Sequence, residues 1–125
     1  ARQSSHGSSR TWLIAEVGGQ PVGLVQGRRR RPNTLMLFSM WVDPVARRSG
    51  IGRQLIEELE AWGMGWDADE TILWVFAGNA SAIGFYRDLG FEIVRAGQDA
   101  ESGARFAALA MRRDIRAPST GITRS

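Results

Sequence analysis

The sequence predicts an α+β fold, in which a mixed, mostly antiparallel twisted sheet carries helices on its faces. Strand-like and helix-like segments follow one another in the order β-β-β-α-β-α-β-β. Strands alternate with helices only in the middle of that order, which is typical of a mixed sheet rather than of a fully parallel one. A chain of 125 residues is long enough for one hydrophobic core but not for two.

The first half of the chain predicts three strands. Residues 11–17 and 21–27 form a hairpin around Gly18 and Gly19. The run RRRRPN at 28–33 is expected to be a charged, solvated turn, and the largely apolar residues 34–42 form a long strand. Residues 1–10 are polar and lack periodicity, so they are interpreted as a disordered arm or a cloning remnant.

The second half begins with an amphipathic helix over residues 50–64 and continues with a strand at 71–76. Asn79 caps a short helix that runs to Leu89, and Gly90 ends it. Residues 91–94 and 106–111 form a final antiparallel pair, and 115–125 is a flexible tail, so the predicted domain covers 11–114. The first helix has one apolar stripe at intervals of three and four residues: Ile51, Leu55, Leu59, Trp62 and Trp66.

Composition restricts the function classes. No apolar run approaches the roughly 18 residues that a membrane span needs. The absence of cysteine excludes disulfides, thiolate metal sites and a cysteine nucleophile, and it fits a cytoplasmic protein. All 16 basic residues are arginines, which a coding bias explains but which also suit phosphate recognition. A net charge of +3 suits an anionic ligand without requiring nucleic acid.

The strongest local signal is the glycine turn before the first helix. The first four N–H groups of a helix have no partner within it, and the helix dipole makes that end positive. Gly50 and Gly52 remove Cβ atoms that would keep a ligand away from those N–H groups, so the turn predicts a phosphate or pyrophosphate site. A Walker loop fails because Gly52 is followed by Arg-Gln-Leu, and a dinucleotide fingerprint fails because position 55 is leucine.

The segment VDPVARRSGIG, at 42–52, contains an arginine and two glycines in the pattern Arg-x-x-Gly-x-Gly. The segment NASAIGFYRDLGF follows at 79–91. In this order and at this separation, the two segments resemble motifs A and B of the GNAT superfamily, whose members move acyl groups from coenzyme A to amines. The resemblance covers about residues 11–113.

The resemblance implies a coenzyme A site. Backbone amides from Arg48 to Arg53 would hold the pyrophosphate, and the preceding strand would bind the pantetheine arm where it splays away from 71–76. Asn79 would also contact the pantetheine. Tyr86 would protonate the departing thiolate, the alternative being a tyrosine that only packs between helix and sheet. The implied donor-binding residues are Met40, Trp41, Val42, Arg47, Arg48, Ser49, Gly50, Ile51, Gly52, Arg53 and Asn79.

The implied function is N-acetyl transfer from acetyl-CoA to an amine by direct attack in a ternary complex, without a metal. The alternative is a truncated, catalytically weak domain that binds coenzyme A or a partner protein. The sequence identifies no general base: Glu16, Glu92 and Glu101 are carboxylates near strand ends, and His6 lies in the polar arm. A nucleic-acid module that uses the arginine turn is a weaker rival.

One departure from the family concerns the acceptor side. GNAT domains usually begin with a strand and two helices that form much of the acceptor pocket, and here only ten polar residues precede the first hairpin. We therefore expect this region to be truncated or replaced by a partner subunit, as in a homodimer. Trp12 and Trp41 are the candidates for lining the acceptor site, whereas Trp62, Trp66 and Trp74 are expected in the core. The identity of the amine stays open.

Overall fold

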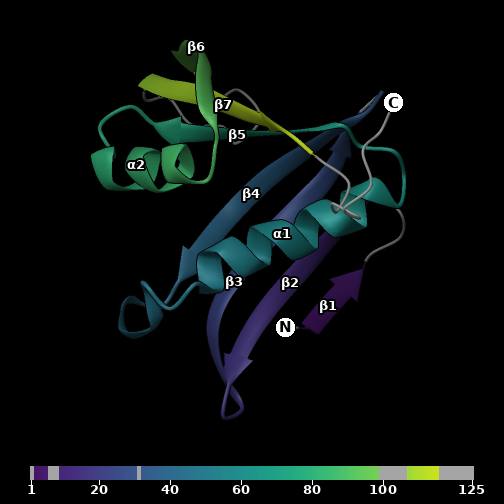
Figure 1. Cartoon of the computed structure of the whole chain (residues 1–125), viewed down its shortest axis with the longest axis vertical. Helices are drawn as coiled ribbons and strands as arrows, with labels where there is room; N and C mark the ends of the chain where they lie inside the picture. The colour runs from purple at the N-terminus through teal and green to yellow at the C-terminus, as the bar shows by residue number, and fades with distance from the viewer. Residues whose placement is uncertain (1, 6–8, 31, 99–106, 116–125) are drawn as a thin grey trace, which may run out of the picture.

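The computed structural model describes residues 2–5, 9–30, 32–98 and 107–115. These form one seven-stranded sheet with two α-helices and one short 3₁₀ helix (Figure 1). The elements in chain order are β1 (Arg2–Ser5), β2 (Arg10–Val17), β3 (Gln20–Arg30), β4 (Thr34–Val42), the 3₁₀ helix η1 (Pro44–Ala46), α1 (Ile51–Met64), β5 (Glu70–Phe76), α2 (Ala80–Asp88), β6 (Glu92–Gln98) and β7 (Ala107–Asp114).

The order of strands across the sheet is β1-β2-β3-β4-β5-β7-β6. All neighbours are antiparallel except β4 and β5, which run parallel because α1 crosses between them. This mixed, mostly antiparallel sheet and the order of the elements from β2 onward confirm the predicted fold class.

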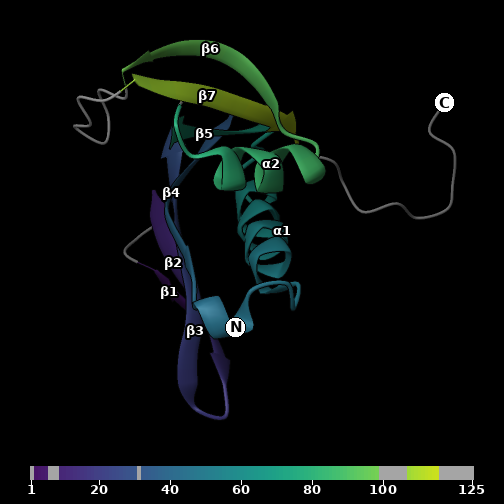
Figure 2. The same cartoon turned by 90° about the vertical axis from the view of Figure 1, so that its left-hand side faces the viewer.

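Both helices lie on the same side of the sheet (Figure 2). The apolar stripe of α1 buries Leu55 and Leu59 against the strands, while Tyr86 of α2 joins the same core. Gly27 of β3 lets α1 approach closely, since a Cβ there would lie 2.5 Å from Leu59 Cδ1. Among the described residues, no helix covers the opposite face of the sheet, so the prediction of helices on its faces holds for one face only.

A buried polar network ties α1 to β5 and β7. Arg113 of β7 donates from Nη2 and Nε to the two carboxylate oxygens of Glu60, at 2.7 and 3.0 Å. The Thr71 hydroxyl of β5 donates to Glu60 Oε2 at 2.6 Å, and Arg113 also donates to the carbonyl oxygen of Leu89. The buried carboxylate is therefore paired with a charge and fully bonded, as burial of a charge requires.

A second polar cluster links the first residues of β4 and β5. The Thr34 hydroxyl donates to Glu70 Oε2 at 2.7 Å, and Arg112 Nε donates to Glu70 Oε1 at 2.9 Å. These bonds, with the threonine the larger contribution, hold the pKa of Glu70 below its ordinary value of 4.5. Arg112 also pairs with Asp114 and, at 3.7 Å, with Glu92.

The structure differs from the sequence predictions in the length of β6, which was expected at 91–94 and extends to Gln98, and at three further places. Residues 2–5 form β1, paired antiparallel with β2, so the expectation of a disordered arm is wrong there and a strand does precede the hairpin. Arg28, Arg29 and Arg30 extend β3 instead of forming a turn. Ile115, which the sequence predicts in the flexible tail, donates its backbone N–H to the carbonyl oxygen of Asp69 and packs against the core. The rest of the predicted tail lies outside the described residues.

Candidate active site

The parallel strands β4 and β5 separate after a short paired region. Their register holds for three pairs, Thr34–Glu70, Leu35–Thr71 and Met36–Ile72, and no further pair follows. A bulge in β4 bends the strand at the same point: Phe38 pairs with Gln26 and Trp41 with Leu24, which leaves two residues of β4 opposite one of β3. Ser39, in this bulge, has a φ of 55°. The peptide groups on this side of β4 are consequently not paired with β5, as the splayed strands of the sequence prediction require.

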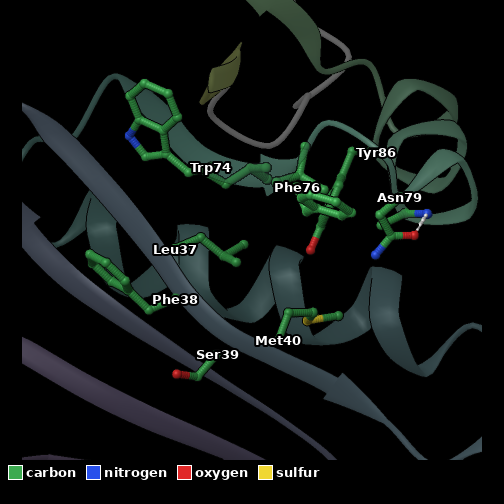
Figure 3. Close-up of a pocket in the computed structure, with 11 residues that line it drawn as sticks. Leu37, Phe38, Ser39, Met40, Trp74, Phe76, Asn79 and Tyr86 are labelled. Carbon is green, nitrogen blue, oxygen red and sulfur yellow. Dashed lines mark hydrogen bonds between the residues drawn. The ribbon is translucent and has the colours of Figure 1, made fainter. Parts of the chain in front are cut away.

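A cavity of about 350 Å³ opens where the two strands diverge (Figure 3). Three elements supply its walls. The lining residues are Leu37, Phe38, Ser39 and Met40 of β4, Leu73, Trp74, Val75 and Phe76 of β5, Ala82 and Tyr86 of α2, and the cap residue Asn79. Most of the lining side chains are apolar, and Ser39, Asn79 and Tyr86 are the polar ones, a mixture that suits a small-molecule site.

Tyr86 points its hydroxyl into the cavity toward Met40 (Figure 3). Its ring is 7% exposed and makes edge-to-face contacts with Phe85 and Phe91, at centroid distances of 5.2 and 5.6 Å. Burial raises the pKa of Tyr86 to about 12, because the tyrosinate anion would lose its hydration. The side chain is therefore both a packing residue and a neutral hydrogen-bond donor facing the cavity.

Asn79 has the capping role that the sequence predicts. Its Oδ1 accepts a hydrogen bond from the Ala82 amide at 3.0 Å at the start of α2. With the oxygen fixed in this way, the side-chain amide nitrogen is directed into the cavity (Figure 3). Asn79 and Tyr86 thus present two donors from one helix to the same space.

The glycine turn lies where α1 begins. The physical reason that requires glycine differs between its two positions. Gly50 is the N-cap residue with a φ of 84° and no side-chain cap, and a Cβ there would meet nothing within 4 Å. The first helical bond runs from Gln54 to Gly50, so the intervening amides are free of backbone partners among the described residues. Gly52, in contrast, is buried, and a Cβ would lie 2.8 Å from Phe85 and 3.2 Å from Met40. The expectation that Gly52 keeps space for a ligand is wrong at this point, because its space is filled by α2.

Arginines surround the turn as expected. Arg48 has a φ of 70°, and Arg48 and Arg53 are exposed, as are Ser49 and Gly50. Arg47 donates from Nε to the carbonyl oxygen of Val42 at 3.2 Å, so it links the turn to the end of β4.

The remaining predicted positions lie in different parts of the structure. Asp43 caps η1 through the Val45 amide at 2.9 Å, which is a structural role. Met40 lines the cavity, whereas Trp41 and Val42 follow it on β4. The candidate bases Glu16 and Glu92 are exposed and do not line the cavity, while Glu101 and His6 lie outside the described residues.

Sequence reasoning missed three aromatic residues of the cavity, namely Phe38, Trp74 and Phe76. Phe38 was not singled out, and Trp74 was assigned to the core, but both line the cavity on the side away from Tyr86 (Figure 3). The available signal was the alternation within 71–76: Leu73 and Val75 face the helices, so Trp74 must face the uncovered side. Trp12, proposed for the acceptor site, is not among the lining residues.

Comparison with known proteins gives a consistent result. The model of the acetyltransferase (GNAT) family matches residues 2–91. An uncharacterized N-acetyltransferase of Methanocaldococcus jannaschii is 32% identical over 87 residues, a match that covers 65% of this chain and 38% of that protein.

Solved structures share the fold. A nourseothricin acetyltransferase matches with a TM-score of 0.78 and 25% identity, over 86% of this chain and 66% of the other. The PaiA N-acetyltransferase of Thermoplasma acidophilum, solved in complex with coenzyme A, matches with a TM-score of 0.73 and 20% identity, over 85% and 61%. The chain therefore spans less than two thirds of the length of these relatives. No helix among the described residues is long and apolar enough to cross a membrane.

Proposed function

Because this chain belongs to the acetyltransferase (GNAT) family, we propose that it transfers an acetyl group from acetyl-CoA to the nitrogen of an amine, with both substrates bound at once. The observation that carries the proposal is the divergence of β4 and β5 over a cavity that receives a tyrosine hydroxyl. We place the proposed activity in the cytoplasm, since that is where a cell keeps acetyl-CoA for such transfers.

The donor would lie on the helix side of the sheet. The free amides of residues 50–53, the helix dipole and the exposed Arg48 and Arg53 suit a pyrophosphate, and the open space around Gly50 leaves room for it. From there the pantetheine arm would enter between β4 and β5. The unpaired peptide groups of β4 and the side-chain amide of Asn79 can form hydrogen bonds with it there. The thioester would then lie near Tyr86.

The reaction proposed is direct attack. The amine nitrogen forms a bond to the thioester carbonyl carbon, and the carbon–sulfur bond breaks, releasing the thiolate of coenzyme A. Tyr86 donates its proton to that sulfur, and the proton lost by the nitrogen restores the phenol directly or through water. We expect no covalent acyl-enzyme, since the chain has no cysteine and its sequence shows no activated serine.

The raised pKa limits how Tyr86 works. With the pKa of the phenol about 12 and that of a thiol about 8.5, complete proton transfer is uphill by ~5 kcal/mol. Tyr86 therefore acts first as a hydrogen-bond donor to the developing negative charge on sulfur. The proton moves only as the cationic nitrogen gives up its own proton.

Two measurements test the proposal. Acetyl-CoA at about 100 times its dissociation constant should stabilise the fold by ~2.7 kcal/mol, seen as a higher melting temperature. Thiol release should then depend on an added amine from a panel of primary amines. No melting shift at millimolar acetyl-CoA would refute the donor site, and a shift without thiol release for any amine would favour the alternative of a binding domain.

A further inference from the structure

The uncovered face of the sheet holds the other end of the cavity. Phe38 and Trp74 lie there, at the end opposite Tyr86 and Asn79 (Figure 3). If the donor enters from the helix side, as in the proposed function on which this inference rests, an acceptor amine must approach across this face. The side chains around Phe38 and Trp74 then determine which amines can bind.

An arginine guanidinium lies over each of the two aromatic rings. Arg28 of β3 lies over the ring of Phe38, with its Cζ 4.7 Å from the ring centroid. Arg95 of β6 lies over the ring of Trp74 at 5.1 Å. The two arginines come from opposite sides of the opening, one beside β4 and the other beyond β5 and β7.

Stacking holds these guanidinium groups without using their hydrogen bonds. A cation–π contact uses no hydrogen bond of the guanidinium, so its N–H groups stay available to bind an oxyanion. Among the described residues, neither Arg28 nor Arg95 forms an ion pair with a carboxylate. The nearby carboxylates Glu70, Glu92 and Asp114 engage Arg112 at the closed end of the strands instead.

A second observation points the same way. Arg10 and Arg28 are directly opposite each other in the register of β2 and β3, and so their side chains share the uncovered face. Like charges at such a position repel each other, which a bound anion relieves. The positive charge around the opening is therefore concentrated where an acceptor would lie.

We propose that the acceptor is a small primary amine that also carries a carboxylate or a phosphate, and that Arg28 and Arg95 bind this anionic group. The aromatic rings of Phe38 and Trp74 hold the guanidinium groups in position and supply the apolar wall along which the amine reaches the thioester.

The test compares acceptors that differ only in charge. Amines of the series H₂N–(CH₂)n–COO⁻ are compared with their carboxamides, and O-phosphoethanolamine is compared with ethanolamine. Rates are expressed per unprotonated amine, because the anionic group changes the amine pKa. We expect kcat/KM to favour the anionic member of at least one type of pair by about tenfold or more. The preferred type identifies carboxylate or phosphate, and the preferred n gives its distance from the nitrogen.

Variants connect this preference to the two arginines. Arg28→Gln and Arg95→Gln should each reduce the ratio of kcat/KM for the anionic amine to that for its neutral partner, mainly by raising KM for the anionic amine. In the double variant this ratio should be close to one. Arg87→Gln, which removes the same charge from the exposed surface of α2 on the other side of the sheet, is the matched control and should keep the preference.

Three results would overturn the inference: neutral amines used as well as anionic ones, a preference that persists in the double variant, or no use of any acid or phosphate. The acetyl-CoA melting shift, measured on the same samples, separates these results from a failure of the donor site. A normal shift with the wrong acceptor preference refutes only the inference, whereas a missing shift refutes the proposed function itself.

Discussion

Replacing Tyr86 by phenylalanine removes one hydroxyl group and leaves the ring in place. The ring is almost fully buried and packs edge-to-face on Phe85 and Phe91, and phenylalanine can keep both contacts. Among the described residues the hydroxyl has no hydrogen-bond partner, so its removal should change the free energy of unfolding by less than ~1 kcal/mol. A catalytic role and a packing role therefore predict different results for the same variant.

For the catalytic role, we expect turnover to fall by about a hundredfold with little change in the affinity for acetyl-CoA. The hydroxyl stabilises the charge that develops on sulfur, and this charge is absent while the donor is only bound. The loss should shrink with a thioester of a more acidic thiol, because its thiolate departs without a proton. Steady-state kinetics with the two donors, normalised to folded protein, measure both effects. Unchanged turnover per folded molecule would refute the role and leave Tyr86 as a core residue.

The raised pKa gives an independent check. Tyr86 is the only tyrosine, so the ultraviolet absorbance of tyrosinate reports this residue alone. We expect a midpoint near 12 in the folded protein and near the ordinary value of 10.0 in denaturant. Because the folded pKa is the higher one, its contribution to stability is complete below pH 10 and is lost as the pH rises toward 12. Tyr86→Phe should lack this alkaline loss. A folded-state midpoint near 10 would contradict the burial of the hydroxyl.

Three further predictions concern the framework of the site. Gly52→Ala should destabilise the fold by about 1–3 kcal/mol in denaturant unfolding, because the new Cβ would lie 2.8 Å from Phe85; an unchanged midpoint would argue against this packing. Arg113→Met should cost about 3–5 kcal/mol, since it leaves the Glu60 carboxylate buried without its charge partner, and a loss within ~0.5 kcal/mol would mean that water reaches that carboxylate. Glu70→Gln should be destabilising at pH 7, and the difference from the natural protein should disappear as the pH falls through the pKa of Glu70, which lies below 4.5 in the fold and makes its stabilisation present only above that range. A difference that is independent of pH would show that the effect is not that of the charge.

The sequence was sufficient for the features that depend on local patterns. The apolar stripe of α1, the Asn79 cap and the glycine turn are all defined within a few residues, and each is found where it was predicted. The roles within the donor site that the resemblance implies stay predictions. The splay of β4 and β5 came from the same resemblance and agrees with their register.

The features that the sequence did not predict depend on distant residues. The run Arg28–Arg30 looks like a charged turn in isolation, but it lies in a strand because β2 and β4 pair with both of its edges. Gly52 looks like a ligand-binding glycine, and only the packing of Phe85 from a helix more than 30 residues later shows its other role. The pairing of Glu60 with Arg113 joins residues 53 positions apart, which no local pattern indicates.

The cavity lies where it does because β4 and β5 are paired at one end and diverge at the other. At one end, three residue pairs, the Thr34–Glu70 bond and the Glu60–Arg113 network hold the strands to each other and to α1. At the other end, the bulge at Ser39 turns β4 away, and within the described part of the chain no ladder pair links β4 to β5 beyond Met36 and Ile72. The divergence of the strands therefore follows from the pairing at the closed end together with the bulge in β4. In the proposed function, this opening would hold a thioester from one face and an amine from the other in a fixed relation, which is the requirement for direct transfer between two bound substrates.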